Sequence, residues 1–97
     1  AYATLPTIPV PAPVVETFTD GATDATIIEI RTHDRPALLF KIGDVITQCN
    51  VDIRSAIVTT LGAEAIDTLY LREFGGGALV SQRVEEVSNK VKAALLK

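Results

Sequence analysis

Alternating hydrophobic and polar residues predict two strands in the first third of the chain. Within residues 27–31, Ile28 and Ile30 share one face, and Ile27, Glu29 and Arg31 take the other, which indicates a strand. Residues 14–19 are also strand-like in composition and end at the turn signal Asp20-Gly21. We therefore predict two strands joined by a short turn.

A hairpin is predicted further along the chain. Residues 51–61 and 65–74 are both rich in β-branched residues, and a Gly-Ala step at 62–63 separates them. In the second segment Asp67 falls in phase with Leu69 on the predicted buried face. Because a carboxylate is costly to bury, we expect Asp67 to lie at the margin of that face.

Apolar residues at helical spacing predict two helices, one at residues 36–49 and one from about Ser81 to the end. Asp34 is well placed to cap the first helix, and Asn50 to end it in the left-handed conformation. The apolar positions are Leu38, Ile42, Val45 and Cys49 in the first helix and Val84, Val87, Val91, Ala94 and Leu95 in the second.

The predicted order of elements is β–β–α–β–β–α, which indicates an α+β sandwich with both helices on one face of an antiparallel sheet. A ferredoxin-like domain has the order βαββαβ, so this chain lacks the last strand of that arrangement. We predict that residues 14–19 replace it by pairing with residues 27–31. Residues 51–61 then lie at the opposite edge of the sheet.

Four of the five prolines fall in residues 1–13, which predicts an extended linker followed by a single domain at 14–97. The chain begins with alanine and contains no methionine, so we expect it to be a piece of a longer protein.

Composition narrows the classes of function. The chain is 47% hydrophobic but only 5% aromatic, so its core must be aliphatic. A single cysteine and a single histidine argue against a disulfide framework and a zinc site, and they favour a reducing, cytoplasmic setting. The net charge of −3 without a basic run argues against nucleic-acid binding, and no apolar run approaches a membrane span. We expect neither a cofactor nor a metal.

Candidate catalytic residues are isolated from one another. His33 adjoins Asp34 but has no serine or cysteine nucleophile in a matching pattern nearby, and Cys49 falls on the apolar stripe of the first helix. The three glycines at 75–77 lack the continuation of a phosphate-binding loop. The loop at 32–39 remains, because a helix N-terminus attracts small carboxylates. Spacing alone leaves open whether this loop binds a ligand or only caps the helix.

Residues 26–39, Thr-Ile-Ile-Glu-Ile-Arg-Thr-His-Asp-Arg-Pro-Ala-Leu-Leu, resemble the start of an ACT domain, which opens with a hydrophobic strand and a D-R-P-G-L-L loop. Residues 50–56 resemble the second strand of that family, and residues 60–62 and 67–71 agree with its later segments. The resemblance covers about residues 26–97.

Within the ACT family, the chain is most similar to the C-terminal ACT domain of the bifunctional uridylyltransferase/uridylyl-removing enzymes, which modify the PII nitrogen-signalling protein. Residues 15–20 stand where those enzymes have a Phe-Asp-type turn. The resemblance implies a regulatory domain that senses an amino acid, here glutamine, and whose parent enzyme is a nucleotidyltransferase. This chain itself carries no catalytic residues.

ACT domains bind amino acids at the strand–helix loop, between two such domains packed side by side. The resemblance therefore implies one half of a site from the loop and the other half from a neighbouring ACT domain, in tandem or in a homodimer. The implied residues are Asp34, Arg35, Ala37, Leu38 and Leu39 in the loop and Asn50, Val51, Asp52 and Ile53 in the neighbour.

Ala37 departs from the family pattern, because the family has glycine after D-R-P. A methyl group narrows the approach of a ligand to the backbone. This favours an alternative in which the domain only mediates pairing without holding a ligand. A free-standing amino-acid-binding regulator is a further alternative. Since residues 51–61 expose an apolar sheet edge, we also predict a homodimer through that edge.

Overall fold

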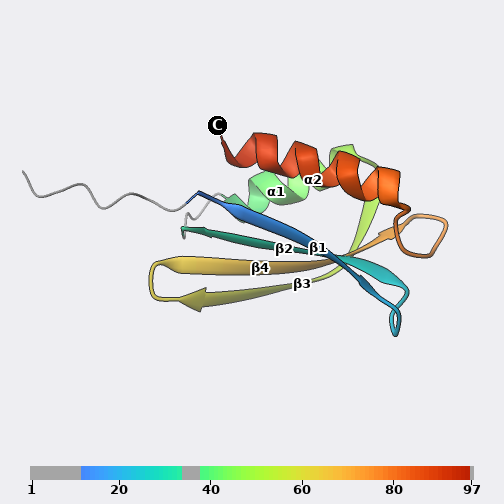
Figure 1. The fold of residues 1–97 in the computed structure, drawn as a ribbon, viewed down its shortest axis with the longest axis horizontal. Coiled ribbons are helices and arrows are strands. Elements are labelled where there is room, and N and C mark those ends of the chain that lie inside the picture. The colour runs from blue at the N-terminus through green and yellow to red at the C-terminus, as the bar shows by residue number, and fades with distance from the viewer. Residues whose placement is uncertain (1–11, 34–37, 97) are drawn as a thin grey trace, which may run out of the picture.

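The computed structural model describes residues 12–33 and 38–96, and it shows a four-stranded antiparallel sheet covered on one face by two helices (Figure 1). The predicted α+β class is thereby confirmed, and the arrangement is compatible with a ferredoxin-like fold. The elements are β1 (Val14–Asp20), β2 (Ala25–His33), α1 (Leu38–Gln48), β3 (Val51–Leu61), β4 (Glu64–Glu73) and α2 (Ser81–Leu95).

The strand order is β1-β2-β4-β3, so the N-terminal strand lies beside β2 as predicted. β1 pairs antiparallel with β2 in a continuous register from Val14 opposite Arg31 to Asp20 opposite Ala25. β3 occupies the other edge and pairs only with β4 among the described strands. The predicted substitution of the missing strand is therefore confirmed.

The turns follow the local residue chemistry. The Asp20 carboxylate accepts hydrogen bonds from the Ala22 N–H at 3.1 Å and the Thr23 hydroxyl at 2.6 Å, which closes the β1–β2 turn. Asn50 has a φ of 59°, confirming that it ends the first helix in the left-handed region. Gly62 has a φ of 62° in the β3–β4 turn, a conformation that glycine adopts without strain.

The core lies between the sheet and the two helices, and it is aliphatic as predicted. Cys49 is buried among these side chains. The predicted stripe of α2 is buried except for Val84, which is half-buried, and in α1 Leu38 and Val45 are half-buried. The largest fully buried side chains are Ile28, Ile30, Ile42, Ile46, Leu69, Leu71, Val87 and Val91.

The expected position of Asp67 was wrong. Its side chain is not at a margin but only 3% exposed, on a strand that has neighbours on both sides. Asp67 lies opposite Ile30 of β2 and Val58 of β3. Because β4 is an inner strand and the period of a strand is two, a residue in phase with Leu69 points into the core whatever its polarity.

Two predicted segments fall partly outside the described residues. Residues 1–11 of the predicted linker are not described, and neither are residues 34–37, which include the expected first turn of α1.

Candidate functional site

The end of β2 carries a buried polar side chain close to another on β4. Thr32 is 7% exposed and lies opposite Ala65, two residues from Asp67 on the helix-covered face of the sheet. Such diagonal neighbours on adjacent strands lie about 7–8 Å apart. Thr32 and Asp67 are thus two buried polar side chains on one face of the sheet, in a layer that is otherwise mainly aliphatic.

The Thr32 hydroxyl has no hydrogen-bond partner within the described part of the chain, and the Nε2 atom of the adjacent His33 is likewise buried and unpartnered. Thr26, near the other end of β2, differs: its hydroxyl accepts a hydrogen bond from the Leu79 N–H at 2.9 Å. Leaving a buried hydroxyl unsatisfied costs about 1–3 kcal/mol. Thr32 is therefore a buried polar group that has no hydrogen-bond partner among residues 12–33 and 38–96, and it lies near the C-terminal end of β2.

An apolar groove of about 430 Å³ lies on the outer side of α1, between the helix and β3. It forms because Ile42 and Ile46 turn toward the core and leave other apolar side chains of α1 facing outward. Leu39 is 39% exposed and Phe40 is 85% exposed. The lining residues are Leu39, Phe40, Gly43, Asp44, Thr47 and Ile53.

The first residues of β3 are held by backbone and side-chain contacts. The Asp52 carboxylate forms an ion pair with Arg54 at 3.4 Å, and the Val51 side chain is buried in the core. The Arg83 guanidinium donates to the carbonyl oxygens of Cys49 at 2.8 Å and Asn50 at 3.4 Å. These contacts fix the backbone where α1 passes into β3.

The structure brings only part of the predicted ligand site together within one copy. Leu39 and Ile53 line the same groove. Asn50 lies beyond the far end of α1, about 16 Å from the start of this 11-residue helix at 1.5 Å per residue. Leu38 packs half-buried against the core. Asp34, Arg35 and Ala37 lie outside the described residues, so the predicted ligand site stays a prediction.

Sequence reasoning included Thr32 in the candidate loop at 32–39 but did not assign it to the ligand site, and it did not select Phe40. Thr32 follows the two-residue alternation of Ile28 and Ile30, and this phase was the available signal that its hydroxyl is buried. Phe40 lies next to the predicted apolar stripe of α1 and carried no comparable signal.

The described residues contain neither a cluster of potential metal ligands nor a membrane-spanning helix. In ranges 12–33 and 38–96, no three His, Cys, Asp or Glu side chains are grouped so that they could hold a metal ion. Neither described helix has the length and apolar character that crossing a membrane requires.

Comparison with known proteins finds bifunctional uridylyltransferase/uridylyl-removing enzymes among the relatives of this chain. A bifunctional uridylyltransferase/uridylyl-removing enzyme of Streptomyces coelicolor is 35% identical over 85 residues, which is 88% of this chain and 10% of the relative. The enzyme of the same name from Acinetobacter baumannii strain AYE is 35% identical over 81 residues, 84% of this chain and 9% of the relative. That from Cereibacter sphaeroides is 33% identical over 78 residues, 79% of this chain and 8% of the relative.

The chain is homologous to a segment of these enzymes. It spans about a tenth of the length of the uridylyltransferase/uridylyl-removing enzymes that it matches. No protein-family model and no solved structure matches the chain.

Proposed function

We propose that this chain is a regulatory ACT domain of a PII uridylyltransferase and that it senses glutamine. The observation that carries the proposal is homology over most of the chain to a small segment of uridylyltransferase/uridylyl-removing enzymes. A domain that matches about a tenth of a large enzyme is suited to regulating chemistry that another part of that enzyme performs. The parent enzyme acts on the PII protein, and this domain reports the level of nitrogen to it.

Two buried polar atoms at the end of β2, Thr32 Oγ1 and His33 Nε2, have no hydrogen-bond partner among the described residues and support a ligand site. The Thr32 hydroxyl has no partner among the described residues, and Thr32 comes six residues before Leu38, where α1 starts. A helix N-terminus favours a carboxylate, and a hydroxyl can donate to one or accept from an ammonium group. An amino acid carries both groups on one carbon, which suits this pairing of side chain and helix end.

Pairing of two copies through β3 supplies the second half of the proposed site. Residues 54–61 of β3 are all exposed, and the register shift between Ile53 and Ser55 leaves Ser55–Leu61 as the regular part of this edge. An antiparallel pairing centred on Val58 is symmetric over that length. It carries Asn50–Ile53 of the partner subunit past Leu61, to the end of the sheet where β2 finishes at His33.

The second candidate is an interaction domain that pairs in the same way without binding a ligand. The apolar groove formed by Leu39, Phe40 and Ile53 favours pairing whether or not a ligand binds, because it continues the exposed edge of β3. Ala37 favours this second candidate, because it stands where the ACT family has glycine and its methyl group leaves a ligand less room to approach the backbone.

Titration with L-glutamine, followed by two-dimensional amide NMR, separates the two candidates. We expect shifts at residues 34–39 and 50–53 with L-glutamine, and none with D-glutamine or L-glutamate. Thr32→Val should raise the dissociation constant measured from these shifts at least tenfold, since it removes the hydroxyl and keeps the shape of the side chain. If L-glutamine causes no shifts at millimolar concentration while the protein is paired, the interaction domain is the better description.

A further inference from the structure

β1 forms the second free edge of the sheet, opposite to β3. Its outer backbone N–H and C=O groups face no strand among the described residues. Natural proteins protect such edges with lysines, prolines or bulges. Val14–Asp20 contains no lysine or proline, and its register with β2 is unbroken. The β1 edge is therefore open to a further strand.

A stripe of polar side chains on α2 lies next to this edge. Ser81, Glu85, Ser88 and Lys92 follow one another at i, i+4, i+7 and i+11, so they share one face of the helix. We call these four residues the polar stripe. They line a groove of about 480 Å³ whose opposite wall includes Thr17 and Thr19 of β1.

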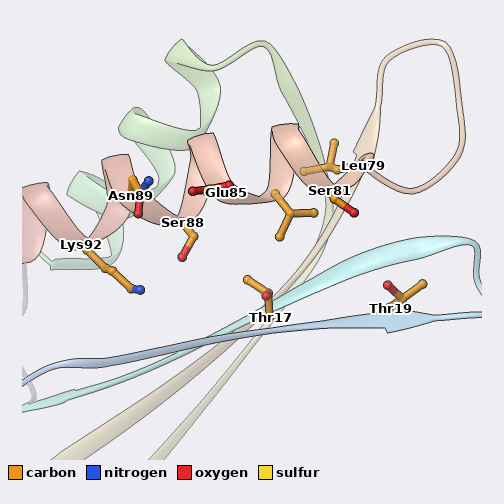
Figure 2. Close-up of a pocket in the computed structure, with 9 residues that line it drawn as sticks. Thr17, Thr19, Leu79, Ser81, Glu85, Ser88, Asn89 and Lys92 are labelled. Atoms are coloured by element: carbon orange, nitrogen blue, oxygen red, sulfur yellow. The ribbon is translucent and has the colours of Figure 1, made fainter.

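Figure 2 shows Thr17 and Thr19 directed toward α2, and Ser88 and Lys92 directed toward β1. Within the described residues, none of the polar-stripe side chains makes a hydrogen bond or an ion pair. Arg83, on another side of the same helix, by contrast donates hydrogen bonds to the Glu73 carboxylate and the Cys49 carbonyl oxygen. The polar stripe is thus the part of α2 that is left without internal partners.

α2 runs antiparallel to β1. The N-terminal residue Ser81 lines the same groove as Thr19, whereas Lys92 also lines a smaller cavity with Pro13 and Val15 at the start of β1 (Figure 1). A twofold axis that pairs β1 with β1 of a second copy therefore also sets the two α2 helices antiparallel. Since α2 is the helix in contact with β1, the same axis sets the two α2 helices side by side on one face of the joined sheet.

The polar stripe is complementary to itself in that arrangement. Glu85 and Lys92 lie at equal distances in sequence on either side of the Ser88–Asn89 step. A twofold axis at this step places Glu85 opposite Lys92 of the partner subunit, and Lys92 opposite Glu85 of the partner subunit. A parallel arrangement would oppose like charges instead, so the charges select the antiparallel one.

We propose that the β1 edge and the polar stripe of α2 form a twofold interface with a second copy of this chain. This interface is separate from the proposed pairing through β3. It also covers Val14 and Phe18, which are 44% and 46% exposed on the face of β1 away from the helices. With one interface at each edge, the sheet continues from copy to copy.

Charge reversal tests the interface in a background in which the β3 edge is blocked by Val58→Glu. The Val58→Glu protein should be dimeric in sedimentation equilibrium. Adding Glu85→Lys or Lys92→Glu replaces two attractive contacts with two repulsive ones, and should raise the dimer dissociation constant by roughly tenfold or more. Circular dichroism would check that each variant is folded.

Mixing the two reversed proteins gives the sharpest outcome. At positions 85 and 92, the Glu85→Lys protein then carries two lysines and the Lys92→Glu protein carries two glutamates. An equimolar mixture should therefore form a heterodimer, although neither protein pairs with itself. Lys90→Glu, on the opposite face of α2, is the matched control and should leave the dimer unchanged. A monomeric Val58→Glu protein, reversed variants that remain dimeric, or a mixture that stays monomeric would each overturn the proposal. Wild-type assembly that is indifferent to Val58→Glu would instead contradict the β3 pairing alone.

Discussion

Arg83 and Glu73 form a two-point ion pair that joins the start of α2 to the end of β4. The Nε atom of Arg83 lies 3.2 Å from one Glu73 carboxylate oxygen, and Nη2 lies 3.2 Å from the other. Nη2 also donates to the Cys49 carbonyl oxygen at 2.8 Å, which otherwise has no partner from α1. One partly buried side chain therefore connects α2, β4 and the end of α1.

Replacing this arginine should destabilise the domain. Arg83→Met keeps most of the side chain's length but leaves Glu73 and the Cys49 carbonyl group without their donor. We expect a loss of about 2–3 kcal/mol in the free energy of unfolding, measured by urea denaturation. Arg83→Lys should recover only a minor part, because an ammonium group cannot make the two-point contact. Full recovery by lysine would contradict the role assigned to the geometry of the guanidinium group.

The same contact predicts how this loss depends on pH. The hydrogen bond to Glu73 raises the pKa of Arg83 above its ordinary value. A raised pKa means that the stabilisation is present below the ordinary arginine pKa and is lost only as the pH rises through the folded-state value. The difference in stability between wild type and Arg83→Met should therefore stay constant from about pH 6 to about pH 9. Urea denaturation at several pH values in that range would check this.

Thr26 and Thr32 offer a matched pair of substitutions on β2. Both are buried on the helix-covered face, but within the described part of the chain only the Thr26 hydroxyl has a hydrogen-bond partner, the Leu79 N–H. Thr26→Val should cost about 1–2 kcal/mol in the free energy of unfolding. Thr32→Val should be neutral or stabilise by about 1 kcal/mol, because it removes a buried polar group that lacks a partner. A loss of stability in Thr32→Val as large as that in Thr26→Val would show that the Thr32 hydroxyl is satisfied within the domain.

Alternation and β-branched composition were sufficient to predict the strands, and the ferredoxin-like order of elements was sufficient to place the N-terminal strand. β1 could be placed beside β2 because the α+β pattern lacked one strand and residues 14–19 were the only strand-like segment left. The same alternation placed Asp67 on the buried face, and the error came from letting the polarity of its side chain outweigh its phase. Periodicity was thus the better guide, since a strand cannot rotate one side chain to the other face.

Contacts between distant residues could not be predicted in this way. Arg83 lies 10 residues from Glu73 and 34 from Cys49, and no local pattern signals that these three meet. The candidate ligand site could not be derived from local patterns either, because its proposed second half comes from another copy of the chain. Residues 34–37 of its first half lie outside the described residues.

Phe40 should matter for pairing and not for folding. Its side chain is 85% exposed at the rim of the groove between α1 and β3. Phe40→Ser should change the free energy of unfolding of a monomeric variant by no more than about 0.5 kcal/mol. It should weaken pairing through β3, because a second copy at that edge covers the groove. Sedimentation of wild type and variant at matched concentrations measures the pairing, and equal association would place Phe40 outside the interface.

Val58 lies at the centre of the regular part of the β3 edge, where it is 50% exposed. In the antiparallel pairing proposed here the two copies of Val58 face each other across the twofold axis. Val58→Glu therefore sets two carboxylates in direct opposition, which is destabilising between strands. We expect the wild-type chain to form assemblies larger than a dimer, and the Val58→Glu protein to form only a dimer that is held by the β1 edge. Gln82→Glu adds the same charge on α2, away from β3, and should leave assembly unchanged.

A cysteine at the same position gives a positive test of the register. Opposed residues in an antiparallel pair have Cβ atoms about 4.5–5.5 Å apart, close enough for a disulfide after a small shift. Val58→Cys should therefore form a cross-linked dimer under mild oxidation, visible on a non-reducing gel. The native Cys49 is buried and should not compete. Thr68→Cys, on the inner strand β4, should not cross-link. Failure of Val58→Cys to cross-link, together with unchanged assembly of Val58→Glu, would rule out pairing through the β3 edge and point to an interface made by the helices.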